Sequence, residues 1–532
     1  MSRDDSPAIR MLERQRDHNR LVRHPLRILS MSSATVVPLV AIVFLLHSLI
    51  HSAVPGAGEP HYFSNSRAFV DPAWCGRDFF LQSGNPHYWF YVLTGPIVAR
   101  LPFPAVAYGG RAFSLLLLAF GWQRLSRRLG LSPFATVQAA VAYCGIVAWG
   151  SFSGEWIVGG LEAKVPAYAF AFCGIADWLD SRVEIRTRSL LKSGGWFGLS
   201  AVFHPVVGLW FVIAVGMSEV AALLWRVRSR RAVIPARTQT TTFLRDAAIF
   251  LTAFAIPAAA GVFPALHVVN ADTVARDQAQ YADFIQVFWR LSHHLDPSVF
   301  WKWGMAFTLS IATLGIAAAA GIAVVRRRIH EQSQPSLWLL WLLLGMSAVI
   351  AGVGFTIGFH AEPAEQLTDW QWRAALLKFY PFRLFDALLP VTASLTVILL
   401  LQTLLAPWQP QLSSFRLRSA VVLLAVLTMI GVSWIHRSQA PAFYTPAQYV
   451  SWQHACEFIR TKTPDESLIV TPSVSWGFKW YAQRAEYVCF KDCPQEAAGI
   501  LEWNRRLWLL ADWRKTSYRD GVVTDDELSV LR

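Results

Sequence analysis

The chain has 532 residues, of which 54% are hydrophobic and only 16% are charged, and its mean hydropathy is +0.35. Soluble globular chains carry about 25% charged residues, so this composition excludes an ordinary soluble enzyme and indicates a chain whose apolar surface faces lipid. The net charge of +13 raises the alternative of nucleic-acid binding. The positive residues are nevertheless divided among short segments between apolar runs, whereas nucleic-acid binding requires them on one accessible face. We therefore expect no nucleic-acid partner.

Several apolar runs with almost no charge approach the length of a membrane helix. A bilayer core of about 30 Å is crossed by about 20 residues in a helix, and backbone groups in lipid must bond within the segment, which favours helices. The clearest runs are residues 35–50, 134–149, 206–224, 303–325, 337–359 and 420–435.

Arginine and lysine clusters between the apolar runs predict the orientation. By the positive-inside rule these segments lie in the cytoplasm. They comprise Arg10, Arg14, Arg16, Arg20, Arg23 and Arg27; Arg124, Arg127 and Arg128; Arg182, Arg186, Arg188 and Lys192; Arg226, Arg228, Arg230 and Arg231; Arg326, Arg327 and Arg328; and Arg416 and Arg418. The basic N-terminal segment, residues 1–33, is expected to be cytoplasmic. No small-residue cleavage site follows the first apolar run, so this run is expected to remain as a signal anchor.

With the N-terminus inside, the chain order gives about eleven spans in a membrane domain of residues 34–436. Residues 52–104 form a long first external loop. Residues 194–224 lie between two basic loops, so the chain must return to the side it left, as two short or re-entrant helices broken near His204 and Pro205. The other spans are residues 35–50, 105–122, 134–149, 165–179, 247–269, 303–325, 337–359, 385–405 and 420–435, and residues 270–300 and 360–382 are external loops.

The tail, residues 437–532, has charges of both signs and reads as a small extracytoplasmic α/β domain. Thr445 before Pro446 is typical of a helix start, and the helix is expected to continue through Arg460. Strands are predicted at 467–471 and 485–490, and a helix at 495–510. Cys489 and Cys493 are either bonded or free thiols. The fold class expected is an all-α polytopic membrane bundle with this α/β domain at its end.

The first external loop holds the candidate catalytic carboxylates. Glu59 lies in the run GEPHY just after the first span, and Asp78 lies further along the loop. A carboxylate at the bilayer surface is partly desolvated and suits a general base acting on a hydroxyl. The alternative for each is a helix cap or a solvated loop acid. His61 and Tyr62 share the run and are candidates for substrate binding.

Two further external segments offer groups for phosphate or sugar. In GGLEAK the glycines permit close backbone approach, and Lys164 beside Glu162 is a point charge suited to phosphate. Lys164 could instead pair with Glu162 or extend toward the membrane surface. In KFYPFRLFD, Arg383 presents a planar fork that matches phosphate, with Lys378 nearby. An interfacial anchor paired with Asp386 is the alternative for Arg383.

Three histidines complete the candidate substrate-binding residues. His293 and His294 are adjacent in RLSHHLDP and point to different faces of a helix, so a shared metal is not expected, whereas hydrogen bonding to sugar or phosphate and a structural role both stay open. His204 at the broken helix pair is either a hydrogen bonder at the kink or a ligand. Because no metal-ligand spacing and no Asp-x-Asp motif occur in the external loops, we expect no metal and no cofactor.

The architecture resembles the GT-C superfamily of membrane glycosyltransferases, which take a sugar from a polyprenyl-phosphate carrier on the extracytoplasmic face. That superfamily commonly has an Asp-Glu pair followed by a tyrosine in the first loop. Here Gly58, Glu59 and Tyr62 occupy the corresponding stretch, so the aspartate is missing. The runs GGLEAK, RLSHHLDP and KFYPFRLFD also look similar to those of uncharacterised bacterial members.

The resemblance implies a multi-pass enzyme of the bacterial inner membrane that moves a sugar from a polyprenyl-phosphate donor to a glycan, lipid or protein acceptor by inverting displacement. Glu59 or Asp78 would be the base, and Arg383 and Lys164 would hold phosphate. The missing aspartate leaves loss of activity as an alternative. Two other classes stay open. A transporter or flippase for a lipid-linked or envelope precursor needs ionisable residues at mid-membrane, and a noncatalytic scaffold predicts external charges that diverge in space.

Overall fold

A computed structural model describes residues 33–56, 58–181, 186–228, 236–270, 274–328, 335–406, 415–437, 444–472, 475–517 and 523–531. The arginines predicted to precede the first span, together with Arg182, Arg230 and Arg231, lie outside the described residues.

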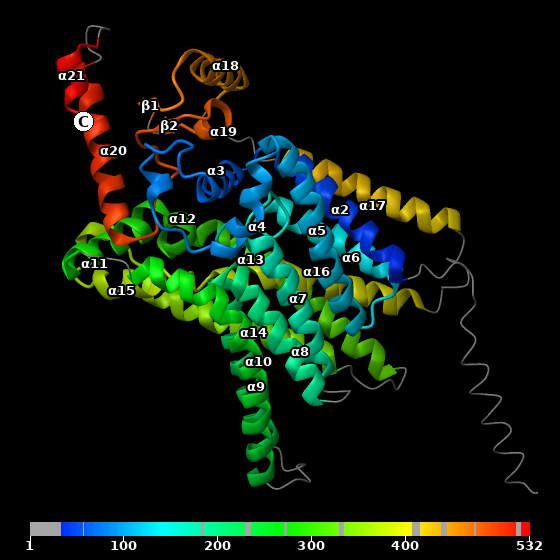
Figure 1. Ribbon diagram of the computed structural model, residues 1–532. Coiled ribbons are helices and arrows are strands. Elements are labelled where there is room, and N and C mark those ends of the chain that lie inside the picture. The colour runs from blue at the N-terminus through cyan, green and yellow to red at the C-terminus, as the bar shows by residue number, and fades with distance from the viewer. Residues whose placement is uncertain are drawn as a thin grey trace, which may run out of the picture.

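The body of the molecule is built from long helices that match the predicted apolar runs closely in position (Figure 1). Most extend beyond the runs, because a helix continues into its polar flanks while its apolar centre is packed or faces lipid. Their bounds are α2 (Ser33–His51), α5 (Phe103–Arg128), α6 (Pro133–Trp149), α7 (Lys164–Asp180), α8 (Arg186–Phe203), α9 (Pro205–Arg228), α10 (Ala236–Asn270), α13 (Pro297–Arg328), α14 (Pro335–Gly358), α16 (Arg383–Leu405) and α17 (Phe415–Ile435).

The predicted break near His204 is confirmed, because α8 ends at Phe203 and α9 begins at Pro205. Proline is tolerated at the first position of a helix, where its missing N–H would have no partner. The two helices are longer than the short or re-entrant pair expected, since α8 begins at Arg186, eight residues before the predicted start at Gly194.

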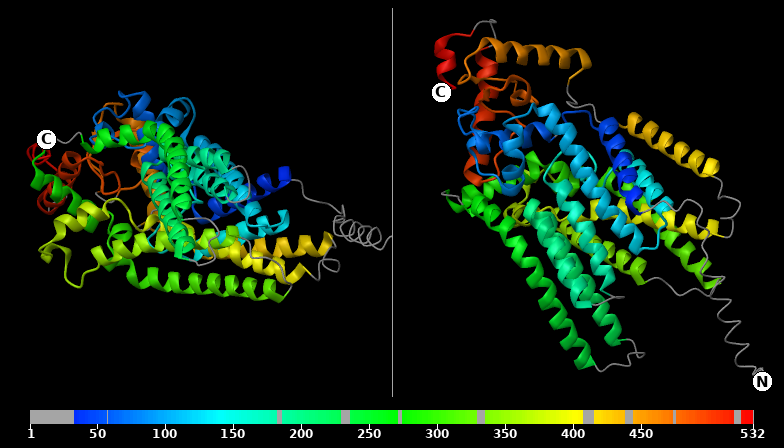
Figure 2. Two further views of the ribbon diagram at one scale, coloured as in Figure 1. Left: turned by 90° about the horizontal axis from the view of Figure 1, so that it is seen from below. Right: turned by 45° about the vertical axis from the view of Figure 1, so that its right-hand side comes forward.

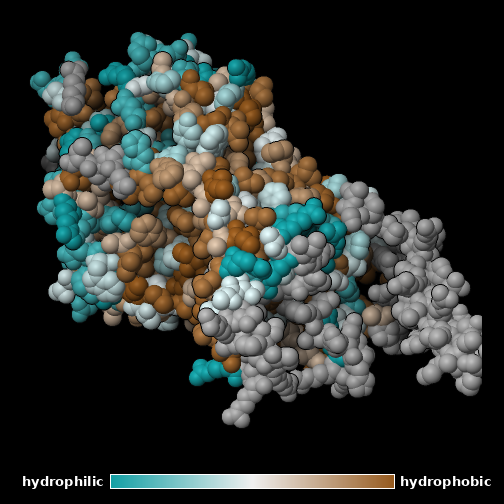
Figure 3. Space-filling view, turned by 60° about the horizontal axis from the view of Figure 1, so that its bottom comes forward, coloured by the Kyte–Doolittle hydropathy of each residue, from teal (hydrophilic) through white to brown (hydrophobic). Residues whose placement is uncertain are grey.

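Helix packing forms one large apolar core. α7 packs between α5 and α8, α8 packs on α10, and α16 packs on α13, α14 and α6. α2 lies against α5, α6 and α17, as the two views of Figure 2 also show. Figure 3 shows apolar residues gathered over the middle of one face, with hydrophilic residues toward its edges.

Six helices within the described residues are long and apolar enough to cross a membrane: α5, α9, α10, α13, α14 and α16. α2, α4, α6 and α17 are apolar but shorter in the part that the structure describes. Charged residues at one end of this body are paired across helices, as in the ion pair at 2.6 Å between Arg124 Nη2 and Asp177 Oδ1. The arrangement is that of a helical membrane protein.

Short elements and the C-terminal segment lie together at the opposite end of the body (Figure 1). The segment between α2 and α5, predicted as a loop, contains helices of its own: α3 (Glu59–Val70), η1 (Phe80–Gln82) and α4 (Tyr88–Val98). The later external loops contain α11 (Arg276–Phe284), the π-helix η2 (Ile285–Arg290), α12 (Ser292–Leu295), η3 (Ala364–Gln366) and α15 (Trp370–Leu377).

The C-terminal segment contains α18 (Pro446–Lys462), β1 (Leu468–Ile469), α19 (Phe478–Ala482), β2 (Ala485–Glu486), α20 (Ala497–Ser517) and α21 (Asp525–Ser529). The predicted start of α18 is confirmed, because Thr445 and Gln448 form a capping box. The strands are shorter than predicted and pair in parallel over two residues each. The apolar residues of α20 pack with Ala282 and Ile285 of the α11–η2 segment, so this part of the tail shares its core with an earlier loop.

Candidate functional site

The loop between α6 and α7 is folded around one carboxylate of α16. The backbone N–H groups of Phe152, Ser153 and Glu155 donate to Asp386 at 2.6, 2.7 and 2.8 Å. Three such bonds satisfy a buried carboxylate and fix the loop that donates them. Asp386 is therefore bound by this loop. Arg383 does not pair with Asp386, the alternative raised from the sequence, but with an acid of the loop itself.

That acid, Glu155, is the centre of a buried ionic group at the end of the helix bundle. Its Oε2 lies 3.1 Å from Arg383 Nε, and its Oε1 lies 3.9 Å from Lys164 Nζ and accepts from Tyr168 Oη at 3.2 Å. Lys164 Nζ also lies 3.6 Å from Glu162 Oε2. We call Glu155, Glu162, Lys164 and Arg383 the Glu155 cluster. It brings two cations and two carboxylates together from two segments of the chain, the loop that leads into α7 and the start of α16.

Aromatic rings and a histidine surround the two cations of the Glu155 cluster. The Arg383 guanidinium lies 4.1 Å from the centre of the Tyr380 ring, and Lys164 Nζ lies 3.7 Å from that of Trp156. Arg383 Nη1 donates to His204 Nε2 at 2.9 Å. A cation over the face of an aromatic ring is attracted by the ring, and this attraction stabilises the cation where water is excluded. His204 at the break between α8 and α9 is thus a direct neighbour of the cluster.

Glu162 lies against the N-terminus of α3, the helix that carries Tyr62. A side chain at Gly58 would place its Cβ 1.9 Å from Glu162 Oε1, so only glycine permits this close approach. Burial raises the pKa of Glu162, although Lys164 opposes the shift. Burial also raises the pKa of Tyr62, and the charge of Glu162 adds to the shift. A carboxylate whose pKa is raised by burial is a stronger base than an ordinary one.

Glu59 lies behind this group and is fully engaged. Arg111 Nε and Nη2 donate to its two carboxylate oxygens at 2.7 Å each, and Leu161 N donates to Oε1 at 2.8 Å. Both side chains of this ion pair are 0% exposed. A carboxylate held by a bidentate arginine and a backbone amide has no free lone pair aimed at a substrate. The geometry favours a structural role for Glu59, as the buried partner of Arg111, and differs from both alternatives, a helix cap and a solvated loop acid.

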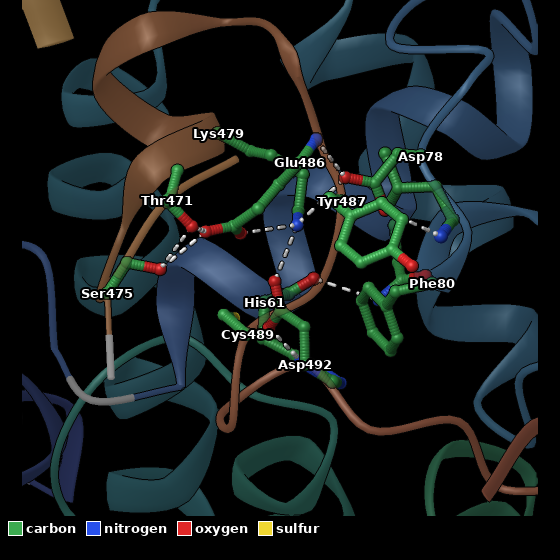
Figure 4. A network of polar contacts seen from close by, with 12 residues as sticks. His61, Asp78, Phe80, Thr471, Ser475, Lys479, Glu486, Tyr487, Cys489 and Asp492 are labelled. Carbon is green, nitrogen blue, oxygen red and sulfur yellow. Dashed lines mark hydrogen bonds and ion pairs between the residues drawn. The ribbon is translucent and has the colours of Figure 1, made fainter. Parts of the chain in front are cut away.

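Asp78 and His61 belong to a second ionic group, the Lys479 cluster of Asp78, Lys479, Glu486 and Asp492 (Figure 4). Lys479 Nζ lies 2.7 Å from Asp492, 3.1 Å from Asp78 and 3.2 Å from Glu486. His61 Nδ1 lies 3.1 Å from the other oxygen of Asp492. This cluster ties the C-terminal segment to the first predicted loop.

The groups of the Lys479 cluster shift one another's protonation. Burial lowers the pKa of Lys479, but its three carboxylates outweigh burial and hold that pKa well above its ordinary value. Burial raises the pKa of Asp78 despite the nearby ammonium. Burial also opposes ionisation of Asp492, yet Lys479 and His61 hold the pKa of Asp492 below its ordinary value. The directions differ because the charges of Glu486 and Asp492 add to the shift of Asp78, whereas hydrogen bonds from His61 and Lys479 favour the charged form of Asp492.

One group among the described residues has the composition of a metal site. Ligand atoms of Glu486, Cys489 and Asp492 all lie within 4.8 Å of one another. The Lys479 ammonium already contacts both of these carboxylates, so a cation of the chain itself lies where a metal would bind.

The remaining candidates lie around or outside the Glu155 cluster. His294 Nδ1 lies 2.6 Å from Ser153 O and lies against the loop that carries Glu155. For its neighbour His293, burial followed by the charges of Arg290 and Lys491 lowers the pKa to about 4. Lys378 binds Asp283 of α11 at 2.8 Å and takes no part in the cluster. Cys489 and Cys493 are free, buried thiols, which decides between the two alternatives for them.

The structure therefore gathers Glu162, Lys164 and Arg383 into the Glu155 cluster. His204 bonds Arg383, and His294 contacts the loop that carries Glu155. Tyr62 lies within range of the charges of Glu162 and Arg383. Sequence reasoning missed Glu155 as the residue that joins the cluster, although it stands in the same external turn as Glu162. It also missed Arg111, whose signal was a single arginine inside an apolar run, since such a charge requires a buried partner.

Fold and clusters together define a helical membrane protein with buried ionic groups at one end of its helices. A family described as a domain of unknown function (DUF6798) matches residues 450–510. This stretch runs from α18 into α20 and contains Lys479, Glu486 and Asp492. No curated protein matches the chain.

Proposed function

We propose that this chain is a membrane glycosyltransferase of the GT-C type that transfers a sugar from a polyprenyl-phosphate donor to an extracytoplasmic acceptor. The observation that carries the proposal is the convergence of Arg383, Lys164, Glu155 and Glu162 at the end of the apolar helices. A lipid phosphate sits at the same depth in a bilayer, between hydrocarbon and water.

The proposed topology follows from the arginine clusters. The N-terminus is cytoplasmic, about eleven helices cross the bacterial inner membrane, and the C-terminal segment is extracytoplasmic. The end of the bundle with the two ionic clusters then faces the envelope, where a lipid-linked sugar is presented to a glycan, lipid or protein acceptor.

In the proposed reaction, an acceptor hydroxyl attacks the anomeric carbon of the sugar as the bond from that carbon to the phosphate oxygen breaks. Glu162 takes the proton of the hydroxyl, because burial has raised its pKa toward the working range of a general base. Arg383 and Lys164 stabilise the negative charge that develops on the leaving phosphate. Attack from the face opposite the leaving group inverts the anomeric centre.

Glu155 and Glu59 take positioning roles in this scheme. Glu155 holds Arg383 at one carboxylate oxygen and Lys164 at the other. The two cations are thereby kept close enough to act on the same phosphate. Glu59 accepts from Leu161 N, the residue before Glu162, and so fixes the base from behind. The base predicted in the first loop moves to Glu162 in the loop before α7.

The test is transfer of label from radiolabelled polyprenyl-phosphate sugars in proteoliposomes. Arg383→Met and Glu162→Gln are each expected to lower transfer by about 100-fold or more, the range seen when a charge-stabilising group or a general base is removed. Arg77→Met and Glu365→Gln change exposed residues outside the cluster and serve as matched controls. Unchanged transfer in both cluster variants would refute the site, and no transfer from any donor by wild type would favour a scaffold.

A further inference from the structure

Lys491 is a half-buried cation, and both carboxylate oxygens of the adjacent Asp492 are already bound by other residues. It follows Phe490 in the turn between β2 and α20, and its backbone oxygen accepts from Arg290 Nη2 at 2.7 Å. The adjacent Asp492 gives its two oxygens to Lys479 and His61. Within the part of the chain that the structure describes, the Lys491 ammonium makes no ion pair. The backbone of Lys491 is held in place by Arg290, but its ammonium group has no carboxylate bound to it in the described residues.

Arg290 is a second cation in the same condition. It ends the π-helix η2, and its guanidinium lies 5.1 Å from the centre of the Phe490 ring. Its Nε is buried and has no hydrogen-bond partner in the described residues. Within the described residues, no carboxylate forms an ion pair with Arg290. Two cations are thus held side by side by the bond from one guanidinium to the other's backbone.

Charges of both signs act on Lys491, and the positive ones prevail. Burial, followed by the charge of Arg290, lowers the pKa of Lys491, and the charges of Glu162 and Asp492 oppose this shift without reversing it. His293 lies near enough to both cations for their charges to lower its pKa, in addition to burial. Like charges gather at a buried site only when something else stabilises them, and an anion is the natural ligand for such a group.

We propose that Lys491, Arg290 and His293 form a second anion-binding group, which takes anionic oxygens of a substrate bound at the Glu155 cluster. The inference rests on the proposed function and deepens it. The His293 ring lies 4.2 Å from the ring of His294, which contacts Ser153 O in the loop that carries Glu155, so one ligand can reach both groups. The anionic oxygens belong either to a second phosphoryl group of the donor lipid or to an acidic acceptor.

The experiment measures binding to full-length protein in phosphatidylcholine nanodiscs. Farnesyl phosphate and farnesyl diphosphate probe the donor, and glucose and glucuronate probe the acceptor. Lys491→Met and Arg290→Met remove one cation each, Lys491→Arg keeps the charge, and Lys462→Met removes an exposed lysine of the same segment as a control. Arg383→Met reports separately on the Glu155 cluster.

Wild type is expected to prefer either the diphosphate over the monophosphate or glucuronate over glucose by about tenfold or more, as one or two charge-assisted hydrogen bonds provide. Lys491→Met and Arg290→Met should abolish that preference while farnesyl phosphate still binds, and Lys491→Arg should restore it. The ligand that shows the preference identifies the source of the anion.

Two results would overturn the second anion group: no preference in either pair of ligands, or a preference that survives in both methionine variants. If the methionine variants lose binding of both ligands of a pair equally, that would also count against the second anion group, since it indicates a general change in the fold. If wild type fails to bind farnesyl phosphate, the proposed donor fails instead, and the glucuronate comparison still decides the role of Lys491.

Discussion

The buried pair of Glu59 and Arg111 offers the sharpest test of how the site is built. Arg111 donates to both oxygens of Glu59 and also to Ser52 O at 2.6 Å. Neither side chain touches solvent. Removing one partner leaves an uncompensated buried charge, which costs about 3–5 kcal/mol of stability. Glu59→Gln and Arg111→Met should therefore each destabilise the protein by an amount in this range.

The assay is unfolding in mixed micelles of increasing SDS fraction, followed by the fluorescence of the 24 tryptophans. The double variant Glu59→Gln, Arg111→Met should cost clearly less than the sum of the two single variants, because no unpaired charge remains once both are changed. Strictly additive losses would contradict the buried pair. A Glu59→Gln protein as stable as wild type but without transfer activity would return the catalytic base to Glu59.

Three further outcomes follow from the described geometry. Lys479→Met leaves three buried carboxylates without their cation, so limited proteolysis should cut the C-terminal segment faster than in Lys462→Met, and equal rates would count against the cluster as a tether. His293 has a folded-state pKa of about 4 against an ordinary value of 6.5. The unfolded chain therefore binds more protons between these values, stability should fall as pH is lowered from 6.5 to 4, and His293→Asn should flatten that slope in unfolding curves. Finally, Cys489 and Cys493 are free and buried, so without reductant both should react with maleimide only after denaturation, and mass spectrometry showing a bonded pair would contradict the structure.

Local signals in the sequence were sufficient for the long apolar helices but not for α3 and α4, which lie where a loop was predicted. The break at His204 follows from the proline after it, and the start of α18 follows from Thr445 before Pro446, because both depend on backbone groups within a few residues. The strands of the C-terminal segment were predicted too long. Tyr487 and Val488, which follow β2, pack in the core that α20 shares with α11, and no local pattern reveals that contact.

The candidate site was predictable only as a list of ionisable groups near helix ends. Lys164, Glu162, Arg383 and His204 were all named from their positions, but which carboxylate joins them depends on tertiary structure. Glu155 does so because Asp386 folds its loop inward. Glu59 was assigned to chemistry because its partner, Arg111, lies 52 positions later inside an apolar helix. Pairings at that separation cannot be read from spacing alone.

α3 is the element through which the membrane body, the candidate site and the C-terminal segment are connected. A helix turns about 100° per residue, so His61 leaves α3 on the side opposite Glu59. Glu59 binds Arg111 of α5, and His61 binds Asp492 of the C-terminal segment. Gly58, at the N-cap of the same helix, lies against Glu162. A shift of this one short helix would therefore disturb the Glu59–Arg111 pair, the Lys479 cluster and the surroundings of Glu162 together.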